Sequence, residues 1–277
     1  MYKVLITGVS GFIGSYLLNY LRENGKYHIT GLSREPEKLS DNLDSKLSYE
    51  DVFNSAYNYH IYIHLAGQVI KEDRNIAEDH YKSANYSLTK KVYDRFLNDE
   101  LSKKFIFLSS IHVLTEIPET IIDESYIPEP FTAYGRSKFK AENYIISNRI
   151  DKKHVYILRP TMIHGPGNKG NLKSLYDYLI AGWPYLFGAA NNKRSFLSIE
   201  NLSFILMEFI DNDIEDGLYH ISDDEPTLTL DLINHISKIS GVKVKVINIP
   251  LIFLRVIAYI SNYLPVPFDI HRYGKLT

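Results

Sequence analysis

A glycine-rich turn between an apolar strand and an amphipathic helix constrains the fold of this chain more than any other feature. The strand ends at Thr7, and three glycines follow at the spacing Gly-x-x-Gly-x-x-Gly, namely Gly8, Gly11 and Gly14. The first glycine permits the bend, the second lets the backbone approach a pyrophosphate, and the third lets the helix pack closely on the strand. The helix N-terminus adds free N–H groups and a positive dipole end. The turn therefore predicts a dinucleotide site; the alternative is a strand–helix turn that binds nothing.

Strand and helix patterns alternate along the first half of the chain. Apolar strands are expected at residues 27–32, 61–65, 105–108 and 154–158, and helical periodicity at 81–97 and 133–150. This alternation is typical of βαβ units and predicts an α/β fold with a Rossmann-type doubly wound parallel sheet. Helices at 172–181, 199–211 and 230–240 and strands at 218–221 and 243–249 follow. We expect residues 1–164 to bind dinucleotide and residues 165–277 to form mainly a smaller α/β substrate lobe, with some elements returning to the core.

Composition excludes several classes of protein. The 277 residues carry a net charge of −2, which gives no electrostatic footprint for nucleic acid, and no cysteine, which excludes disulfides and thiolate metal sites. No metal site is expected. The N-terminus enters a strand at once, so we expect a cytoplasmic protein without a signal peptide. The apolar stretch Leu251–Leu264 contains Arg255 and is too short to span a bilayer. It is expected to pack on the core; the alternatives are an interfacial membrane helix or an oligomer contact.

The end of the second strand bears on the choice of cofactor. Ser33 and Arg34 stand where this class of fold commonly has an acidic residue that binds the adenosine ribose. An arginine there can hold the 2′-phosphate of NADP, and no carboxylate is present to repel it. This pair favours NADP(H), with NAD(H) as the alternative if Arg34 is a solvated loop charge.

A tyrosine and a lysine four residues apart are the candidate catalytic pair. Tyr134 and Lys138 would share one face of a helix, and a nearby ammonium lowers the pKa of a phenol. Such a phenol can exchange a proton with a substrate oxygen while a nicotinamide exchanges hydride. Ser110, at the end of a neighbouring strand, could bond the same oxygen. Chance alone predicts about two Tyr-x-x-x-Lys pairs in this composition. The other pair, Tyr86 and Lys90, lies inside a helix and is expected to be structural.

Several motifs occur together in one order along the chain. They are the turn from Thr7 to Gly14, Ala66-Gly67, Ser109-Ser110, Tyr134-x-x-x-Lys138, Leu158-Arg159-Pro160, Gly165-Pro166-Gly167 through Asn171, and Arg194-Ser195-Phe196. In this order and over nearly its whole length the chain resembles the extended short-chain dehydrogenases/reductases of the nucleotide-sugar epimerase/dehydratase family. Within that family it most resembles the bacterial surface-polysaccharide branch of UDP-sugar 4-keto reductases.

The resemblance implies roles for individual residues. Tyr134 would be the catalytic acid/base, Lys138 would tune its pKa and contact the cofactor ribose, and Ser110 would bind the substrate O4. The cofactor would be bound by Gly8, Ser10, Gly11, Phe12, Ile13, Gly14, Ser33, Arg34, Leu65, Ala66, Gly67, Asn85, Ser109, Tyr134, Lys138 and Pro160. The substrate would be bound by Ser110, Asn171, Phe187 and Arg194. The family also implies a homodimer. Related chains continue past Arg272–Thr277, so a C-terminal truncation is expected.

The residues after Ser110 narrow the reaction. Family members that catalyse 4,6-dehydration have an acidic pair there, whereas this chain has Ile111 and His112, so dehydration is not expected. The remaining reactions are 4-keto reduction and 4-epimerisation. Ser33-Arg34 favours NADPH and hence reduction of a UDP-4-keto-6-deoxy-N-acetylhexosamine for surface polysaccharide synthesis. The alternatives are an NAD-dependent 4-epimerase of a UDP-hexose or UDP-N-acetylhexosamine, and a non-catalytic NADP(H)-binding sensor or scaffold.

Overall fold

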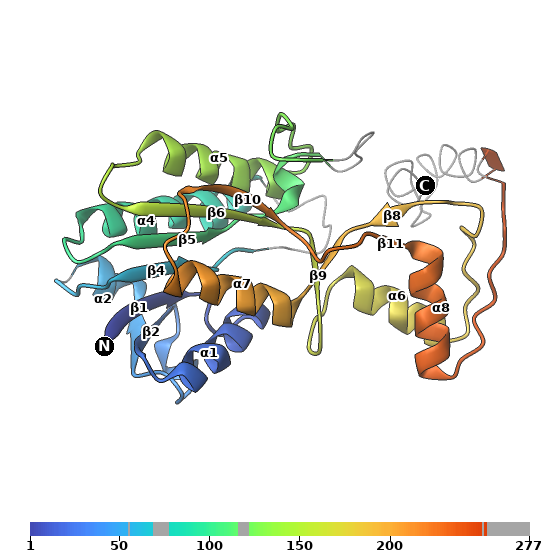
Figure 1. The fold of residues 1–277 in the computed structure, drawn as a ribbon, viewed down its shortest axis with the longest axis horizontal. Coiled ribbons are helices and arrows are strands. Elements are labelled where there is room, and N and C mark those ends of the chain that lie inside the picture. Colours follow the sequence, from blue (N-terminus) through green and yellow to red (C-terminus); the bar gives the residue numbers. More distant parts are fainter. Residues whose placement is uncertain (55, 69–77, 116–121, 251, 254–277) are drawn as a thin grey trace. The chain divides into compact units, whose positions relative to one another are not determined.

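The protein was analysed as a computed structural model that describes residues 1–54, 56–68, 78–115, 122–250 and 252–253 (Figure 1). The chain divides into two compact units. The first consists of residues 1–163 and 197–221, and the second of residues 164–196 and 222–277. The chain therefore returns to the first unit after it has entered the second.

A seven-stranded parallel sheet forms the centre of the first unit. Its order is β10-β6-β5-β4-β1-β2-β3. The strands are β1 (Tyr2–Thr7), β2 (Tyr27–Ser33), β3 (Ser45–Ser48), β4 (Ile61–His64), β5 (Lys104–Leu108), β6 (His154–Pro160) and β10 (Gly217–Ile221). The Rossmann-type doubly wound sheet is thereby confirmed. The strand order reverses between β1 and β4, and ligands of such sheets bind outside the carboxyl ends of the strands at this switch point.

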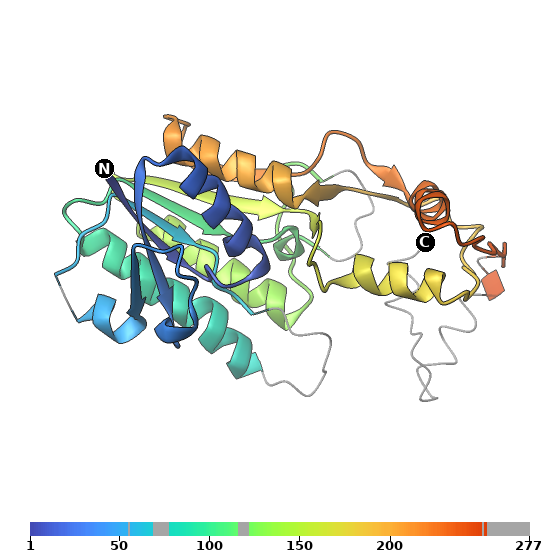
Figure 2. The ribbon, with the colours of Figure 1, turned by 90° about the horizontal axis from the view of Figure 1, so that it is seen from below.

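Helices cover both faces of this sheet (Figure 2). On one face, α1 (Phe12–Asn24) and α7 (Ile199–Asp211) bury leucines against Val4 and Ile6 of β1. On the other face, α2 (Tyr49–Phe53), α4 (Leu88–Asn98) and α5 (Ala133–Ser147) enclose a second cluster that includes Leu5. Neighbouring residues of β1 thus point to opposite faces of the sheet. Residues on both faces are apolar because the strand is buried on both sides.

The second unit is smaller and has its own apolar cluster. It contains α6 (Asn171–Ile180) and α8 (Thr229–Ser240), which pack around Leu179, Tyr185 and Ile233. The short strands β8 (Lys193–Arg194) and β11 (Thr227–Leu228) pair antiparallel. Two further short strands, β7 (Met162–His164) and β9 (Phe196–Ser198), lie where the chain passes between the units.

The structure corrects several boundaries expected from the sequence. The helix expected at 81–97 is three segments, α3 (Glu78–Tyr81), the π-helical η2 (Lys82–Ser87) and α4. The strand expected at 243–249 is reduced to two isolated bridges, Tyr185–Val246 and Phe187–Asn248. The remaining elements are two 3₁₀ turns, η1 (Pro36–Lys38) and η3 (Ile111–Val113).

The apolar stretch Leu251–Leu264 lies outside the described residues, apart from Ile252 and Phe253, which are helical and exposed. In the part of the chain that the structure describes, no helix combines the length and the apolar character that crossing a membrane requires.

Candidate active site

The turn after β1 has the shape that a dinucleotide pyrophosphate requires. Gly8 has a φ of +73°, and a Cβ there would lie 2.7 Å from the backbone nitrogen of Ala66. A Cβ on Gly14 would lie 2.4 Å from the carbonyl oxygen of Gly8. Gly11 is the N-cap of α1, no side chain caps this helix end, and its first turn contains no acidic residue. The free N–H groups of α1 therefore remain available for an anion, and the turn fits the cofactor.

The remaining turn residues lie around this helix start. Ser10 and Gly11 are exposed, whereas Phe12 and Ile13 are half-buried and pack against the cluster beneath α1. The end of β4 lies beside the turn, because Thr7 and His64 are partners in the β1–β4 register. The Ala66 N–H donates to Thr7 Oγ1 at 3.2 Å, which fixes Leu65–Gly67 next to the glycines.

His64 of β4 is fully buried, and both of its ring nitrogens have hydrogen-bond partners. Its Nδ1 lies 2.6 Å from Thr7 Oγ1, and its Nε2 lies 2.9 Å from Thr89 Oγ1. Burial, assisted by the positive charge of Lys138, lowers the pKa of His64 to about 3. The ring is therefore neutral at physiological pH, and it ties the glycine turn to α4.

Tyr134, Lys138 and Ser110 lie together at the carboxyl end of β5. Thr132 caps α5 by accepting a bond from the Gly135 N–H at 3.0 Å, which places Tyr134 in the first turn of this helix. The hydroxyl groups of Tyr134 and Ser110 are hydrogen-bonded to each other. Lys138 is 3% exposed, and its Nζ donates to the carbonyl oxygen of Leu108 at 2.9 Å. A Cβ on Gly67 would lie 2.9 Å from that Nζ, so the ammonium reaches the end of β4 as well.

The pKa of Tyr134 differs from the expectation. The sequence predicted a lowered value, but burial raises the pKa of the Tyr134 hydroxyl to about 12, and the bond from Ser110 lowers it only in part. Burial also lowers the pKa of Lys138 to about 8, against the opposing effect of the Glu142 carboxylate. Desolvation is the largest influence on both groups, and it disfavours their charged forms; Lys138 is buried, whereas Tyr134 as a whole is half-buried.

Asn85 and Ser109 also lie at this edge of the sheet. Asn85 is fully buried in η2, where its Oδ1 accepts from the Gln68 N–H at 2.7 Å and its Nδ2 donates to Ser137 Oγ at 3.0 Å. The π-helical turn directs this side chain between the end of β4 and α5. The Ser109 hydroxyl donates to Glu142. Pro160 is buried at the end of β6.

Ser33 is the last residue of β2, the neighbour of β1 on the far side from β4, and Arg34 follows it. Ser33 is half-buried, and its Oγ accepts from the Glu35 N–H at 3.2 Å. Arg34 is exposed. The first acidic side chain after β2, that of Glu35, pairs with Lys38. The end of β2 thus presents a guanidinium and a hydroxyl.

Three of the four residues expected to bind the substrate lie in the second unit. Asn171 is exposed at the first position of α6, Phe187 is half-buried with its ring 5.7 Å from that of Tyr185, and Arg194 lies on β8. Burial lowers the pKa of Arg194, and the Tyr185 hydroxyl opposes this shift.

Three further polar groups of the same unit were not predicted from the sequence to belong to a site. Tyr185 OH, Asn192 Oδ1 and Thr229 Oγ1 are buried without a hydrogen-bond partner among the described residues. The Thr229 N–H donates to the Asn192 carbonyl at 3.2 Å, which joins the start of α8 to the strand that carries Arg194. No spacing rule predicts this grouping, because it depends on the pairing of β8 with β11.

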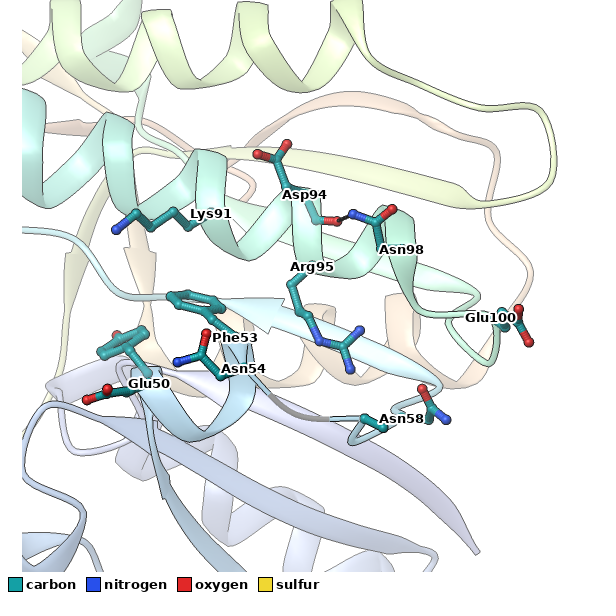
Figure 3. A pocket seen from close by; sticks show the side chains of 11 residues that line it. Glu50, Phe53, Asn54, Asn58, Lys91, Asp94, Arg95, Asn98 and Glu100 are labelled. Carbon is teal, nitrogen blue, oxygen red and sulfur yellow. Dashed lines mark hydrogen bonds between the residues drawn. The ribbon is translucent and has the colours of Figure 1, made fainter.

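A separate cavity of about 920 Å³ lies between α2 and α4 (Figure 3). It is lined by Tyr49, Glu50, Phe53, Asn54, Ala56, Asn58, Lys91, Asp94, Arg95, Asn98 and Glu100. It shares no residue with the expected site. Its arginine, Arg95, already donates to the backbone carbonyls of Val52 and Tyr57.

The parallel sheet, the glycine turn at its switch point and the apposed Tyr134, Lys138 and Ser110 define an enzyme with a Rossmann-type dinucleotide-binding domain. The model of the NAD dependent epimerase/dehydratase family matches residues 4–221, and the chain belongs to this family.

Individual relatives lie within the same family. The chain is 28% identical over 250 residues to a UDP-glucose 4-epimerase of Vibrio cholerae, covering 85% of this chain and 75% of the relative. It is 25% identical over 214 residues to the N-acetyl-alpha-D-glucosaminyl-diphospho-ditrans,octacis-undecaprenol 4-epimerase of Escherichia coli O157:H7, covering 75% of this chain and 62% of the relative. The crystal structure of UDP-glucuronic acid 4-epimerase from Bacillus cereus in complex with NAD shares the fold, with a TM-score of 0.74, 21% identity, and coverage of 89% and 87%.

Proposed function

We propose that the protein is an NAD-dependent 4-epimerase of a UDP-hexose or UDP-N-acetylhexosamine. The hydrogen-bonded hydroxyls of Tyr134 and Ser110, with the Lys138 ammonium one helical turn away, carry the proposal. This arrangement suits the transfer of a proton to and from a sugar hydroxyl. The relatives from Vibrio cholerae and Escherichia coli named above are 4-epimerases of a diphosphate-linked sugar, which supports this reaction.

Each of the three side chains has a distinct role in this proposal. NAD, when bound at the glycine turn, would supply the hydride chemistry at C4 of the sugar. Tyr134 takes the proton of the O4 hydroxyl as the hydride leaves, and it gives the proton back when the hydride returns to the other face of C4. Ser110 holds O4 by a hydrogen bond. Because burial raises the pKa of Tyr134 to about 12, its phenolate needs a cation, and Lys138 supplies it.

We assign the nucleotide part of the substrate to the second unit. Arg194 and Asn171 would bind the diphosphate, since a guanidinium and an amide donate to phosphate oxygens. Phe187 would lie along the uracil, as an aromatic ring can cover a base. A homodimer stays a prediction from the family resemblance.

The end of β2 favours a second candidate, a 4-keto reductase that uses NADPH. Arg34 is exposed, and the nearest carboxylate along the chain, Glu35, pairs with Lys38. A guanidinium in this place can hold a 2′-phosphate. A reductase must release its oxidised cofactor after every turnover, whereas an epimerase retains NAD, so cofactor retention separates the two candidates.

The cofactor content of the purified protein tests the proposal. The protein is dialysed and denatured, the released nucleotide is identified by chromatography, and the intact protein is incubated with UDP-glucose and with UDP-N-acetylglucosamine without added cofactor. Stoichiometric NAD and formation of the 4-epimer support epimerisation. Loss of all nucleotide on dialysis, with oxidation of added NADPH by a UDP-4-keto-6-deoxy-N-acetylhexosamine, would establish the reductase instead. Binding of NADP(H) without turnover of any of these sugars would indicate a sensor.

A further inference from the structure

One face of α5 is bonded to the carboxyl end of β5 at three successive turns. Tyr134 bonds the hydroxyl of Ser110, Lys138 donates to the carbonyl of Leu108, and a third residue, Glu142, accepts from the Ser109 hydroxyl. Positions 134, 138 and 142 are four residues apart and therefore lie on one helix face. The first two are the proposed catalytic pair, and the third has no part in the chemistry described above.

Glu142 is a fully buried carboxylate, 0% exposed, and its charge is balanced by an equally buried arginine. Arg159 of β6 is 4% exposed and donates to both carboxylate oxygens, from Nε at 3.0 Å and from Nη2 at 2.6 Å. A buried pair of this kind is weak evidence for added stability, because desolvation of two charges opposes their attraction. Its position on the same face of α5 as Tyr134 and Lys138 calls for another explanation.

The electrostatic effect of Glu142 on Lys138 supplies that explanation. Burial lowers the pKa of Lys138, and the carboxylate of Glu142 is the charge that opposes the shift and leaves the value at about 8. Without this carboxylate the ammonium would lose its proton at a still lower pH. A neutral Lys138 could not stabilise the phenolate of Tyr134.

We propose that Glu142 is a positioning residue for the reaction: it keeps Lys138 positively charged at neutral pH and fixes the end of β5 through Ser109, while Arg159 holds the carboxylate in place. This inference rests on the proposed role of Tyr134 and Lys138. It adds a third residue to the pair, acting through Lys138 and not on the substrate.

Several charged and titratable groups of the described residues lie near this pair. Lys138 acts on His64 of β4, and Arg159 of β6 bonds Glu142 and lies 3.4 Å from His220 of β10. The His220 N–H donates to Glu124, and Tyr81 of α3 acts on Tyr134. His64 is neutral at physiological pH because its pKa is about 3. Burial also lowers the pKa of His220. Among these groups, Glu142 is the carboxylate that raises the pKa of Lys138 against the effect of burial.

A pair of variants separates the electrostatic role from a structural one. Glu142→Gln alone leaves Arg159 buried without a counter-ion, so we expect it to unfold at a markedly lower urea concentration. Combining it with Arg159→Met removes both charges, and we expect this double variant to recover most of the lost stability. If the pair is only structural, the double variant should also recover the wild-type pH profile. If the proposal is correct, the double variant folds but its Lys138 titrates at a lower pH.

Two readouts measure this difference. Lys138 is titrated by NMR in the protein as purified, labelled with [ε-¹³C]lysine, and its signal is identified by its loss in Lys138→Arg. We expect its midpoint to fall by about one pH unit or more in Glu142→Gln, given an opposite charge one turn away in protein surroundings, and by less in the double variant, because loss of the Arg159 charge offsets part of the effect. The second readout is the alkaline limb of kcat, which should move with it, so that kcat at pH 8 falls about fivefold while KM changes little. Glu142→Asp, which keeps the charge, should retain the wild-type midpoint.

Glu78→Gln is the matched control, because Glu78 of α3 forms an exposed ion pair at 3.1 Å with Arg136, which lies on α5 as Glu142 does. It should change neither readout. An unchanged Lys138 midpoint in both Glu142→Gln and the double variant would overturn the inference. The titration needs no substrate, so a shifted midpoint in a protein that epimerises no UDP-sugar would support the role of Glu142 and count against the proposed reaction alone.

Discussion

Replacing Gly14 by alanine has two opposing effects on the free energy of unfolding. Gly14 lies in α1, and alanine in a helix interior is favoured over glycine by about 1 kcal/mol. However, the new Cβ would lie 2.4 Å from the Gly8 carbonyl oxygen and 2.5 Å from Val9 Cα, which are backbone atoms that no rotamer change can move. Overpacking of this kind costs about 1–3 kcal/mol. We therefore expect a net loss of about 1 kcal/mol in the free energy of unfolding.

The larger expected effect is on cofactor binding. Relief of the overlap must move α1 away from the turn, and the N–H groups at its start move with it. Loss of one hydrogen bond to a charged pyrophosphate is worth about 1.5–3 kcal/mol, so NAD affinity should fall by about 10- to 100-fold. Isothermal titration calorimetry with NAD and urea denaturation measure the two effects separately.

Gly25→Ala is the matched control at the other end of α1. Gly25 has a φ of +62°, and a Cβ there meets no atom within 4 Å. It should lose about 1 kcal/mol of stability from left-handed backbone strain and bind NAD as the wild type does. A Gly14→Ala protein that is more stable than the wild type and binds NAD equally well would refute the reasoning about the turn.

Three further predictions follow from the site. Tyr134→Phe should lower turnover at least 100-fold without releasing bound cofactor, whereas Tyr86→Phe, from the other Tyr-x-x-x-Lys pair, should keep most of it; a Tyr134→Phe enzyme above a tenth of wild-type turnover would exclude the proton-transfer role. Because the folded-state pKa of His64 is about 3 and its ordinary value is 6.5, the unfolded chain binds the extra proton below pH 6.5, so stability falls with acidity. His64 should contribute a loss of about 2 kcal/mol between pH 6.5 and pH 5 in urea denaturation, which His64→Gln removes and His80→Gln does not, while the lowered pKa of His220 adds a separate loss. Arg34→Ala should weaken NADP binding about tenfold and leave NAD binding unchanged. Equal effects on both cofactors would show that Arg34 does not bind the 2′-phosphate.

Local sequence patterns predicted the first βαβ unit well, because the signals there are contiguous. The strand before Gly8, the glycine spacing and the cap glycine Gly25 all lie within one short segment. The same holds for α7, whose expected bounds at 199–211 agree with the structure. The strand expected at 243–249 was wrong because an apolar alternating segment forms a strand only where a neighbouring edge is available, and here the pairing stops at two bridges.

The π-helical turn η2 could not be predicted from the helical periodicity of the sequence. Residues 81–97 keep a helical pattern throughout, yet Asn85 is turned inward to bond Gln68 and Ser137, which come from distant parts of the chain. Hydrogen bonds to such partners can favour a local departure from the α-helix that the segment alone would not adopt.

The order of the motifs along the sequence was sufficient to select Tyr134 over Tyr86 and to place the chain among dinucleotide-binding α/β enzymes. These signals can be read from the sequence because backbone sterics and strand–helix alternation act over a few residues. The protonation of the catalytic groups was decided only by the tertiary structure. The pKa of Tyr134 is raised and that of Lys138 lowered because folding removes water from both, and the carboxylate that partly restores the charge of Lys138 is held by an arginine on another strand. Desolvation depends on every element packed around a group, and no spacing along the chain records it.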